Sequence, residues 1–167
     1  MHNLKPISRD SIPSALERAE RYRLLNEPVE AESICLDVLQ IEPANQRALS
    51  TLLLSLTDQF EEDASGLFEQ AVRLLNRFED DYNRTYYKGV VYERHAKAHL
   101  KRGGMGAGYV AYDWINTAMT CYAEAEKIRP SDNDESILRW NTCARLLQRR
   151  TDLKPSPHED AVEHMLE

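Results

Sequence analysis

Apolar residues recur at every third or fourth position along most of the chain. In the first such stretch Ile12, Ala15, Leu16 and Ala19 follow this spacing, which places them on one face of an α-helix. Six further stretches have the same period, and Asn26-Glu27-Pro28, Pro43, the glycines at 103–108 and Pro130 mark four of the separations between them, since such residues interrupt helices. The pattern predicts an all-α protein with helices over about 12–25, 28–42, 44–58, 61–78, 81–102, 109–128 and 134–149.

The connections between these helices are short, which predicts antiparallel helical hairpins stacked side by side. The hairpins are expected over 12–43, 44–78 and 81–130, followed by a capping helix over 134–150. Residues 1–11 are expected to form a lead-in segment. Residues 151–167 are expected to form a mobile acidic tail, with one helical turn around 160–165.

One spacing recurs in the second helix of each hairpin. A small residue is followed four positions later by an aromatic residue or another apolar filler. A second small or apolar residue comes three positions after that, and the helix ends five positions further on. The positions are Ala31, Cys35, Val38 and Pro43 in the first hairpin, Ala64, Phe68, Ala71 and Asn76 in the second, and Ala118, Tyr122, Ala125 and Pro130 in the third.

The first helices add a second regularity, a small residue three positions before a tyrosine. Ala19 and Tyr22 follow it, as do Gly89 and Tyr92, whereas the second hairpin has leucines at both positions. Together the two spacings resemble the tetratricopeptide repeat over about residues 12–150. A helical bundle without repeats is the alternative.

The resemblance implies a short right-handed superhelix whose first helices line a concave groove. Such a protein is expected to be a non-enzymatic scaffold without cofactors, which binds a peptide segment or a helix of another protein. Co-chaperone members of the family clamp a terminal carboxylate with groove Lys and Asn residues, and Leu16 and Glu20 depart from that pattern. The predicted groove residues are Leu16, Glu20, Arg23, Arg47, Ser50, Leu54, Thr57, Tyr86, Val90 and Glu93.

The third hairpin is longer than the others. The chain takes 9 residues from Tyr22 to Ala31 but 26 from Tyr92 to Ala118. The excess is centred on the glycine turn at 103–108, so each helix gains about eight residues, or about 12 Å. The tip is expected to contact its own helices, a second protomer or a partner protein, through Lys97, Lys101, Arg102, Tyr109, Tyr112 and Trp114.

The net charge and its distribution along the sequence indicate which classes of partner the protein could bind. The net charge is −7, which disfavours binding to nucleic-acid phosphates. Residues 1–80 carry 8 basic and 15 acidic side chains, whereas residues 81–130 carry 8 basic and 5 acidic ones. The basic long hairpin could therefore dock on the acidic N-terminal region of another copy, which makes a homodimer the alternative function. Membrane insertion is not expected, because the longest apolar stretch, 48–56, is too short.

The sequence gives little support for a metal site, a phosphate-binding loop or a reactive cysteine. His95 and His99 stand one helical turn apart, a metal-site spacing, but no HExxH glutamate or nearby cysteine pair accompanies them. The glycine run at 103–108 follows a predicted helix, unlike a phosphate-binding loop, which follows a strand. Three cysteines without a CxxC pair are expected to be buried free thiols in a reducing compartment, so a cytoplasmic location is expected.

Overall fold

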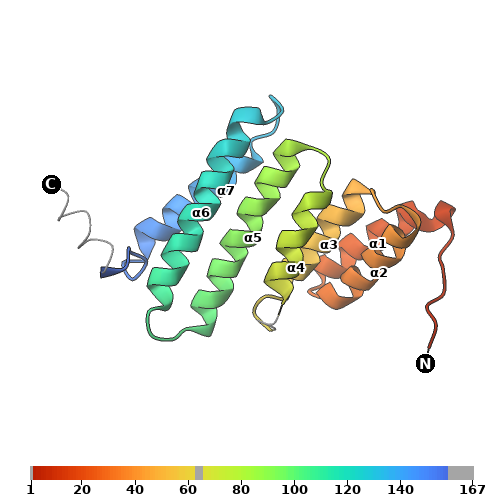
Figure 1. Cartoon of the computed structure of the whole chain (residues 1–167), viewed down its shortest axis with the longest axis horizontal. Helices are drawn as coiled ribbons and strands as arrows, with labels where there is room; N and C mark the ends of the chain where they lie inside the picture. Colours follow the sequence, from red (N-terminus) through yellow and green to blue (C-terminus); the bar gives the residue numbers. More distant parts are fainter. Residues whose placement is uncertain (1, 63–65, 158–167) are drawn as a thin grey trace. The chain divides into compact units, whose positions relative to one another are not determined.

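The chain is all-α, as its apolar spacing predicts. The computed structural model describes residues 2–62 and 66–157, and every regular element in these ranges is a helix. The chain divides into two compact units, residues 1–79 and 80–167, which are considered one at a time below (Figure 1). The helical turn expected at 160–165 and most of the expected tail lie outside the described residues.

The first unit contains two helical hairpins. Its elements are the 3-10 turn Arg9–Ser11, α1 (Ile12–Leu24), α2 (Pro28–Ile41), α3 (Gln46–Asp58), α4 (Leu67–Leu74) and the 3-10 turn Leu75–Arg77. α2 begins on a proline, which needs no hydrogen bond to its nitrogen there. α3 is capped by Asn45, whose side chain accepts a hydrogen bond from the Ala48 amide at 2.9 Å.

The expected helix over 61–78 is wrong at its start. α4 begins only at Leu67, because Gly66 before it adopts a left-handed conformation with φ of 85°, which does not continue a helix. Ala64, the small residue of the second hairpin's spacing, lies outside the described residues. Phe68 and Phe60 contact each other across this turn, with ring centroids 6.3 Å apart.

The core of the first unit consists of small and aliphatic side chains. Ala19, Ala31, Cys35 and Val38, which carry the repeat-like spacing, are all completely buried. α2 packs against both α1 and α3. The buried residues of α3 are leucines, Ala48 and three hydroxyl residues, Thr51, Ser55 and Thr57, and no ionised side chain lies among them. The residues that carry the repeat-like spacing are therefore those at which these helices pack against one another.

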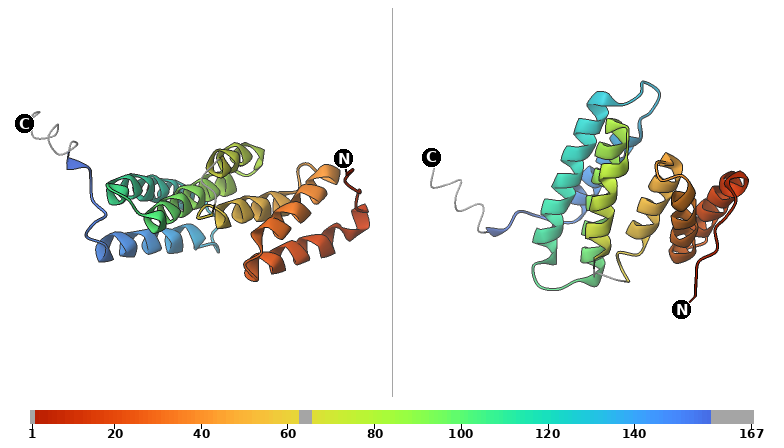
Figure 2. Two further views of the ribbon diagram at one scale, coloured as in Figure 1. Left: turned by 90° about the horizontal axis from the view of Figure 1, so that it is seen from below. Right: turned by 45° about the vertical axis from the view of Figure 1, so that its right-hand side comes forward.

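The second unit is a long hairpin with a third helix against it. α5 (Asp81–Arg102) and α6 (Ala107–Ile128) have 22 residues each, against 13 in α1 and 14 in α2. α7 (Glu135–Arg149) packs on α6, and Figure 2 shows it along one side of the α5–α6 pair. α7 runs antiparallel to α6, so its last residues lie at the glycine end of the hairpin (Figure 1).

The long hairpin depends on one close approach. A Cβ atom at Gly89 of α5 would lie 2.6 Å from the ring of Tyr122 on α6, too close for any side chain. Tyr122 is completely buried there, and its ring is 5.9 Å from that of Tyr86. Glycine at this position thus lets an aromatic ring fill the space between the two helices.

Candidate functional site

The predicted groove residues of the first unit do not form an open groove. Leu16 and Thr57 are buried, with only 3% and 4% of their surfaces exposed, because they pack into the core between helices. Glu20 of α1 accepts two hydrogen bonds from Arg47 of α3, at 2.7 and 2.8 Å. The remaining predicted side chains of this face are Arg23, which pairs with Asp58 at 2.8 Å, Ser50, whose hydroxyl donates to the Arg47 carbonyl, and Leu54, which is half-buried.

The predicted groove residues of the second unit are buried too. Tyr86, Val90 and Glu93 are all inaccessible or nearly so, and placing them on an open surface was wrong. Tyr86 packs between the rings of Tyr82 and Tyr122, at centroid distances of 5.8 and 5.9 Å. The expectation failed because α7 lies beside α5 and α6 and supplies Arg139, which contacts both Tyr86 and Glu93.

Glu93 is the centre of a buried polar cluster. Its carboxylate accepts hydrogen bonds from the Tyr122 hydroxyl at 2.6 Å, from Arg139 at 3.4 Å and from Lys97. Burial alone would raise the pKa of Glu93, but Lys97, Tyr122 and Arg139 outweigh it and hold the pKa below its usual value. The cluster joins α5, α6 and α7 through one ionised group. Sequence spacing gave no signal for it, because Arg139 is 46 residues away.

The histidine pair belongs to the packing of the long hairpin. The rings of His95 and His99 lie 4.2 and 5.2 Å from that of Trp114, measured between centroids. Two helical turns of α5 thus meet one tryptophan of α6. In the described part of the chain, no group of three or more His, Cys, Asp or Glu side chains is arranged to hold a metal ion.

The predicted tip residues divide into two groups. Lys97 and Trp114 serve the interior of the hairpin, through Glu93 and the two histidines. Lys101 and Arg102 are exposed in the last turn of α5, Tyr109 lines a pocket at the start of α6, and Tyr112 is half-buried. Lys101 and Arg102 are the most exposed of the six, and the side chain of Lys97 is also 41% exposed.

The pocket at the tip has a volume of about 490 Å³. Leu100, Tyr109 and the glycine turn form one side, and residues 150–154, which follow α7, form the other. The two sides approach closely, since a Cβ atom at Gly108 would lie 2.3 Å from the Asp152 carbonyl. The stretches 98–109 and 145–154, which meet here, hold one acidic residue, Asp152, and six basic ones: Lys101, Arg102, Arg145, Arg149, Arg150 and Lys154.

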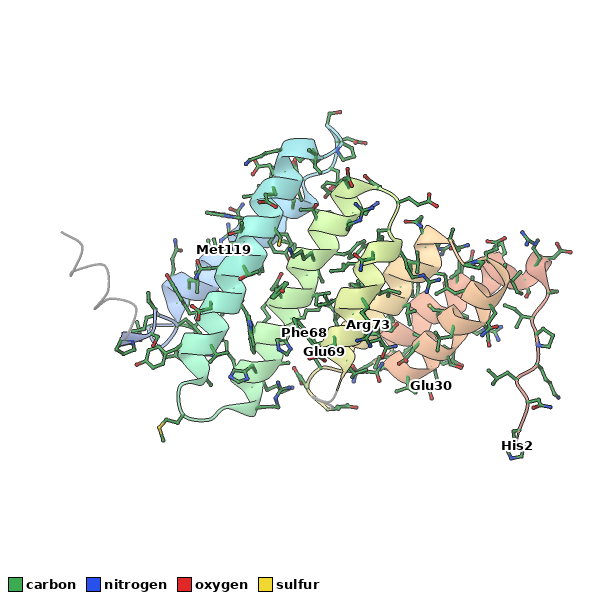
Figure 3. All side chains as sticks on the ribbon, viewed as in Figure 1. His2, Glu30, Phe68, Glu69, Arg73 and Met119 are labelled. Atoms are coloured by element: carbon green, nitrogen blue, oxygen red, sulfur yellow. The ribbon has the colours of Figure 1, made fainter. Side chains whose placement is uncertain are left out.

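A second opening lies on the first unit, on the outer side of the α1–α2 hairpin. It has a volume of about 540 Å³ and is lined by Ser11, Ser14, Ala15, Arg18 and Tyr22 from the α1 side, by Glu30, Ser33, Ile34 and Asp37 from α2, and by Ile7. We call it the outer groove. Glu30 lies in the first turn of α2 and is labelled in Figure 3. Sequence reasoning missed this face because it looked for a surface on the side that the first helices share.

The cysteines are buried and unpaired. Burial raises the pKa of the Cys35 and Cys143 thiols to about 12, and it raises that of Cys121 as well. Thiolate, the nucleophilic form, is therefore scarce at neutral pH. Cys35 sits where the repeat-like spacing has an aromatic residue in the other hairpins and acts as a small apolar filler.

The described residues thus form two all-α units, each with a pocket at its surface. None of the helices in residues 2–62 and 66–157 has the length and apolar character needed to cross a membrane. Comparison of the chain with protein-family models, with curated proteins and with solved structures finds no match.

Proposed function

We propose that this protein is a non-enzymatic interaction module, which binds an acidic segment of another polypeptide at the tip of the α5–α6 hairpin. The observation that carries the proposal is the tip pocket with its basic surroundings. In a chain with net charge −7, the basic residues Arg150 and Lys154 line this opening, and four more basic residues lie in the stretches of chain that adjoin it. Such a local excess favours encounter with acidic segments.

The pocket also offers more than charge. Leu100 and Tyr109 line it beside Arg150 and Lys154, and an apolar surface flanked by cations suits a peptide with an apolar residue among acidic ones. Arg150 is held by Asp152 in a two-point ion pair, at 2.8 and 2.6 Å, which positions it at the rim. The tetratricopeptide-like spacing supports the same class of function, because stacked hairpins commonly serve as scaffolds.

A peptide selection followed by a binding measurement tests this proposal. The full chain would be used to select from a random peptide library, and the selected peptides should be enriched in Asp and Glu. A selected peptide carrying a fluorophore would then be titrated with protein and followed by anisotropy. The double variant Lys101→Glu/Lys154→Glu should weaken its binding by at least about tenfold, since two attractions become repulsions.

The matched control is Arg21→Glu, which reverses one exposed charge on α1 of the first unit. It should leave the affinity of the peptide unchanged. Scrambling the selected peptide should weaken binding, because the pocket contacts an apolar residue at a fixed place. A selection without acidic enrichment, or binding that survives the double charge reversal, would contradict the proposal.

A further inference from the structure

The two sides of α1 differ in how their charges are used. Toward α3, Glu20 pairs with Arg47 and Arg23 pairs with Asp58. On the outer groove the α1 wall carries Arg18. No hydrogen bond or ion pair joins it to any residue that the structure describes.

The opposite wall of the outer groove is acidic. Glu30 and Asp37 of α2 line it, and neither is paired with a described residue. Between the walls lie Ala15, Ile34 and the half-buried ring of Tyr22. One groove therefore combines a basic wall, an apolar floor and an acidic wall, and an identical surface turned about a two-fold axis is complementary to it.

We propose that the outer groove binds the outer groove of a second copy of this chain, with α1 of each copy over α2 of the other. This arrangement requires a two-fold axis parallel to the helices. An axis across the helices would instead place α1 on α1 and bring two Arg18 side chains together. The charges of the groove thus select one of the two face-to-face dimers.

The positions of the charged residues along the helix axes, counted from the turn between α1 and α2, agree with the pairing of α1 with α2 of the other copy. Arg18 lies seven residues before Leu25, the residue that follows α1, and Asp37 lies nine residues after Pro28, the first residue of α2. The difference of two residues corresponds to about 3 Å along the axis, within the reach of an arginine side chain. In the same way Tyr22, three residues before Leu25, stands level with Glu30, two residues after Pro28, so its hydroxyl can donate to the partner's carboxylate.

The turn end of the hairpin gives independent support. Leu25 and Val29 stand there with 61% and 57% of their surfaces exposed, and Asn26 between them holds the turn with φ of 60°. An axis parallel to the helices brings the two turns to the same end of the dimer. The four aliphatic side chains can then cover one another, which removes apolar surface from water.

Reversal of single charges tests the proposal through the oligomeric state. Sedimentation equilibrium of the full chain should show a dimer that forms with rising concentration. Arg18→Glu and Asp37→Arg should each weaken the dimer at least about tenfold, because each places two like-charge pairs in the interface. An equimolar mixture of the two variants should dimerise nearly as well as the wild type, since the two reversed side chains face each other in the mixed dimer.

The double variant Arg18→Glu/Asp37→Arg should also regain the dimer. Glu17→Arg and Arg21→Glu, exposed α1 residues that do not line the groove, are the matched controls and should change dimerisation less than threefold. A wild type that stays monomeric at high concentration would overturn the proposal. So would a mixture no stronger than its components, or controls that weaken the dimer equally. Lys101→Glu/Lys154→Glu should leave the dimer intact, which separates this test from that of the tip pocket.

Discussion

Within each of the two units the helices pack against one another, but they do so through different kinds of side chains. In the first unit, α1, α2 and α3, of 13 or 14 residues, meet mainly through alanines, Cys35 and leucines, and the ion pairs between α1 and α3 are half-buried or exposed. In the second unit, helices of 22 residues meet through Tyr86 and Tyr122, and an ionised carboxylate, Glu93, lies in the interior. The repeat-like spacing of small and apolar residues therefore indicates which positions of two helices are in contact. It does not determine whether the contact is apolar or includes an ionised group.

The difference between the two interiors should affect how mutations change the stability of each unit. An apolar contact weakens in proportion to the surface that it loses. A buried charge is stabilising only while its partners are present, since an unpaired ion in the interior is costly. The second unit should therefore depend on a few residues, and the first should tolerate change at its ion pairs.

Removal of the Glu93 carboxylate is the largest expected effect. Glu93→Ala leaves Lys97 and Arg139 without their shared anion and opens a cavity, so it should lower the free energy of unfolding by about 3–5 kcal/mol. Urea denaturation followed by circular dichroism measures the loss. Hydrogen exchange resolved by peptide should show faster exchange in α5, α6 and α7 than in the wild type, with α1 to α3 changed less. Equal acceleration in both units would contradict the comparison.

Acid should affect the second unit through the same group. The pKa of Glu93 is lowered from the ordinary value of 4.5 in the folded chain, so below pH 4.5 the unfolded state binds the proton first. The contribution of Glu93 to stability is present above pH 4.5 and is lost as the pH falls through the folded pKa. The stability difference between wild type and Glu93→Gln should accordingly shrink below pH 4.5.

The fold was predictable where local signals end a helix. Pro28 and the glycine turn after Arg102 set helix ends that the structure places within two residues. The start of α4 was missed because Gly66 interrupts a stretch that remains apolar at helical spacing, and only its backbone conformation, with φ of 85°, ends the pattern. Apolar periodicity thus predicts that a helix exists. It does not predict a single turn that interrupts a periodic stretch.

The candidate site was predictable only in part. Lys101, Arg102 and Tyr109 were expected at the tip because the glycine turn locates it in the sequence. Glu93 was expected on an open groove, because the resemblance to the tetratricopeptide repeat implies that the face of each first helix opposite its packing residues lines such a groove. Its burial depends on Tyr122, 29 residues away, and on Arg139, 46 residues away. Such distant partners leave no trace in local spacing.

A smaller loss is expected from a single methyl group at Gly89. Gly89→Ala would place its Cβ atom 2.6 Å from the Tyr122 ring, and the ring could move only by disturbing its hydrogen bond to Glu93. Overpacking of this kind costs about 1–3 kcal/mol, even though alanine favours helix more than glycine does. Thermal denaturation measures the shift. Combining Gly89→Ala with Tyr122→Leu should recover part of the loss, whereas a stabilised single variant would contradict the close approach.

The smallest expected effect lies in the first unit, at the ion pair between Glu20 and Arg47. The two side chains are 43% and 47% exposed, so water screens their attraction and competes for their hydrogen bonds. Arg47→Ala should therefore lower the free energy of unfolding by only about 0.2–1 kcal/mol, measured by urea denaturation at low salt. The effect should shrink further in 1 M salt, where the Debye length is about 3 Å. A loss as large as that of Glu93→Ala would show that both units rely on their ion pairs equally, and the contrast between a charged interior and an apolar one would no longer hold.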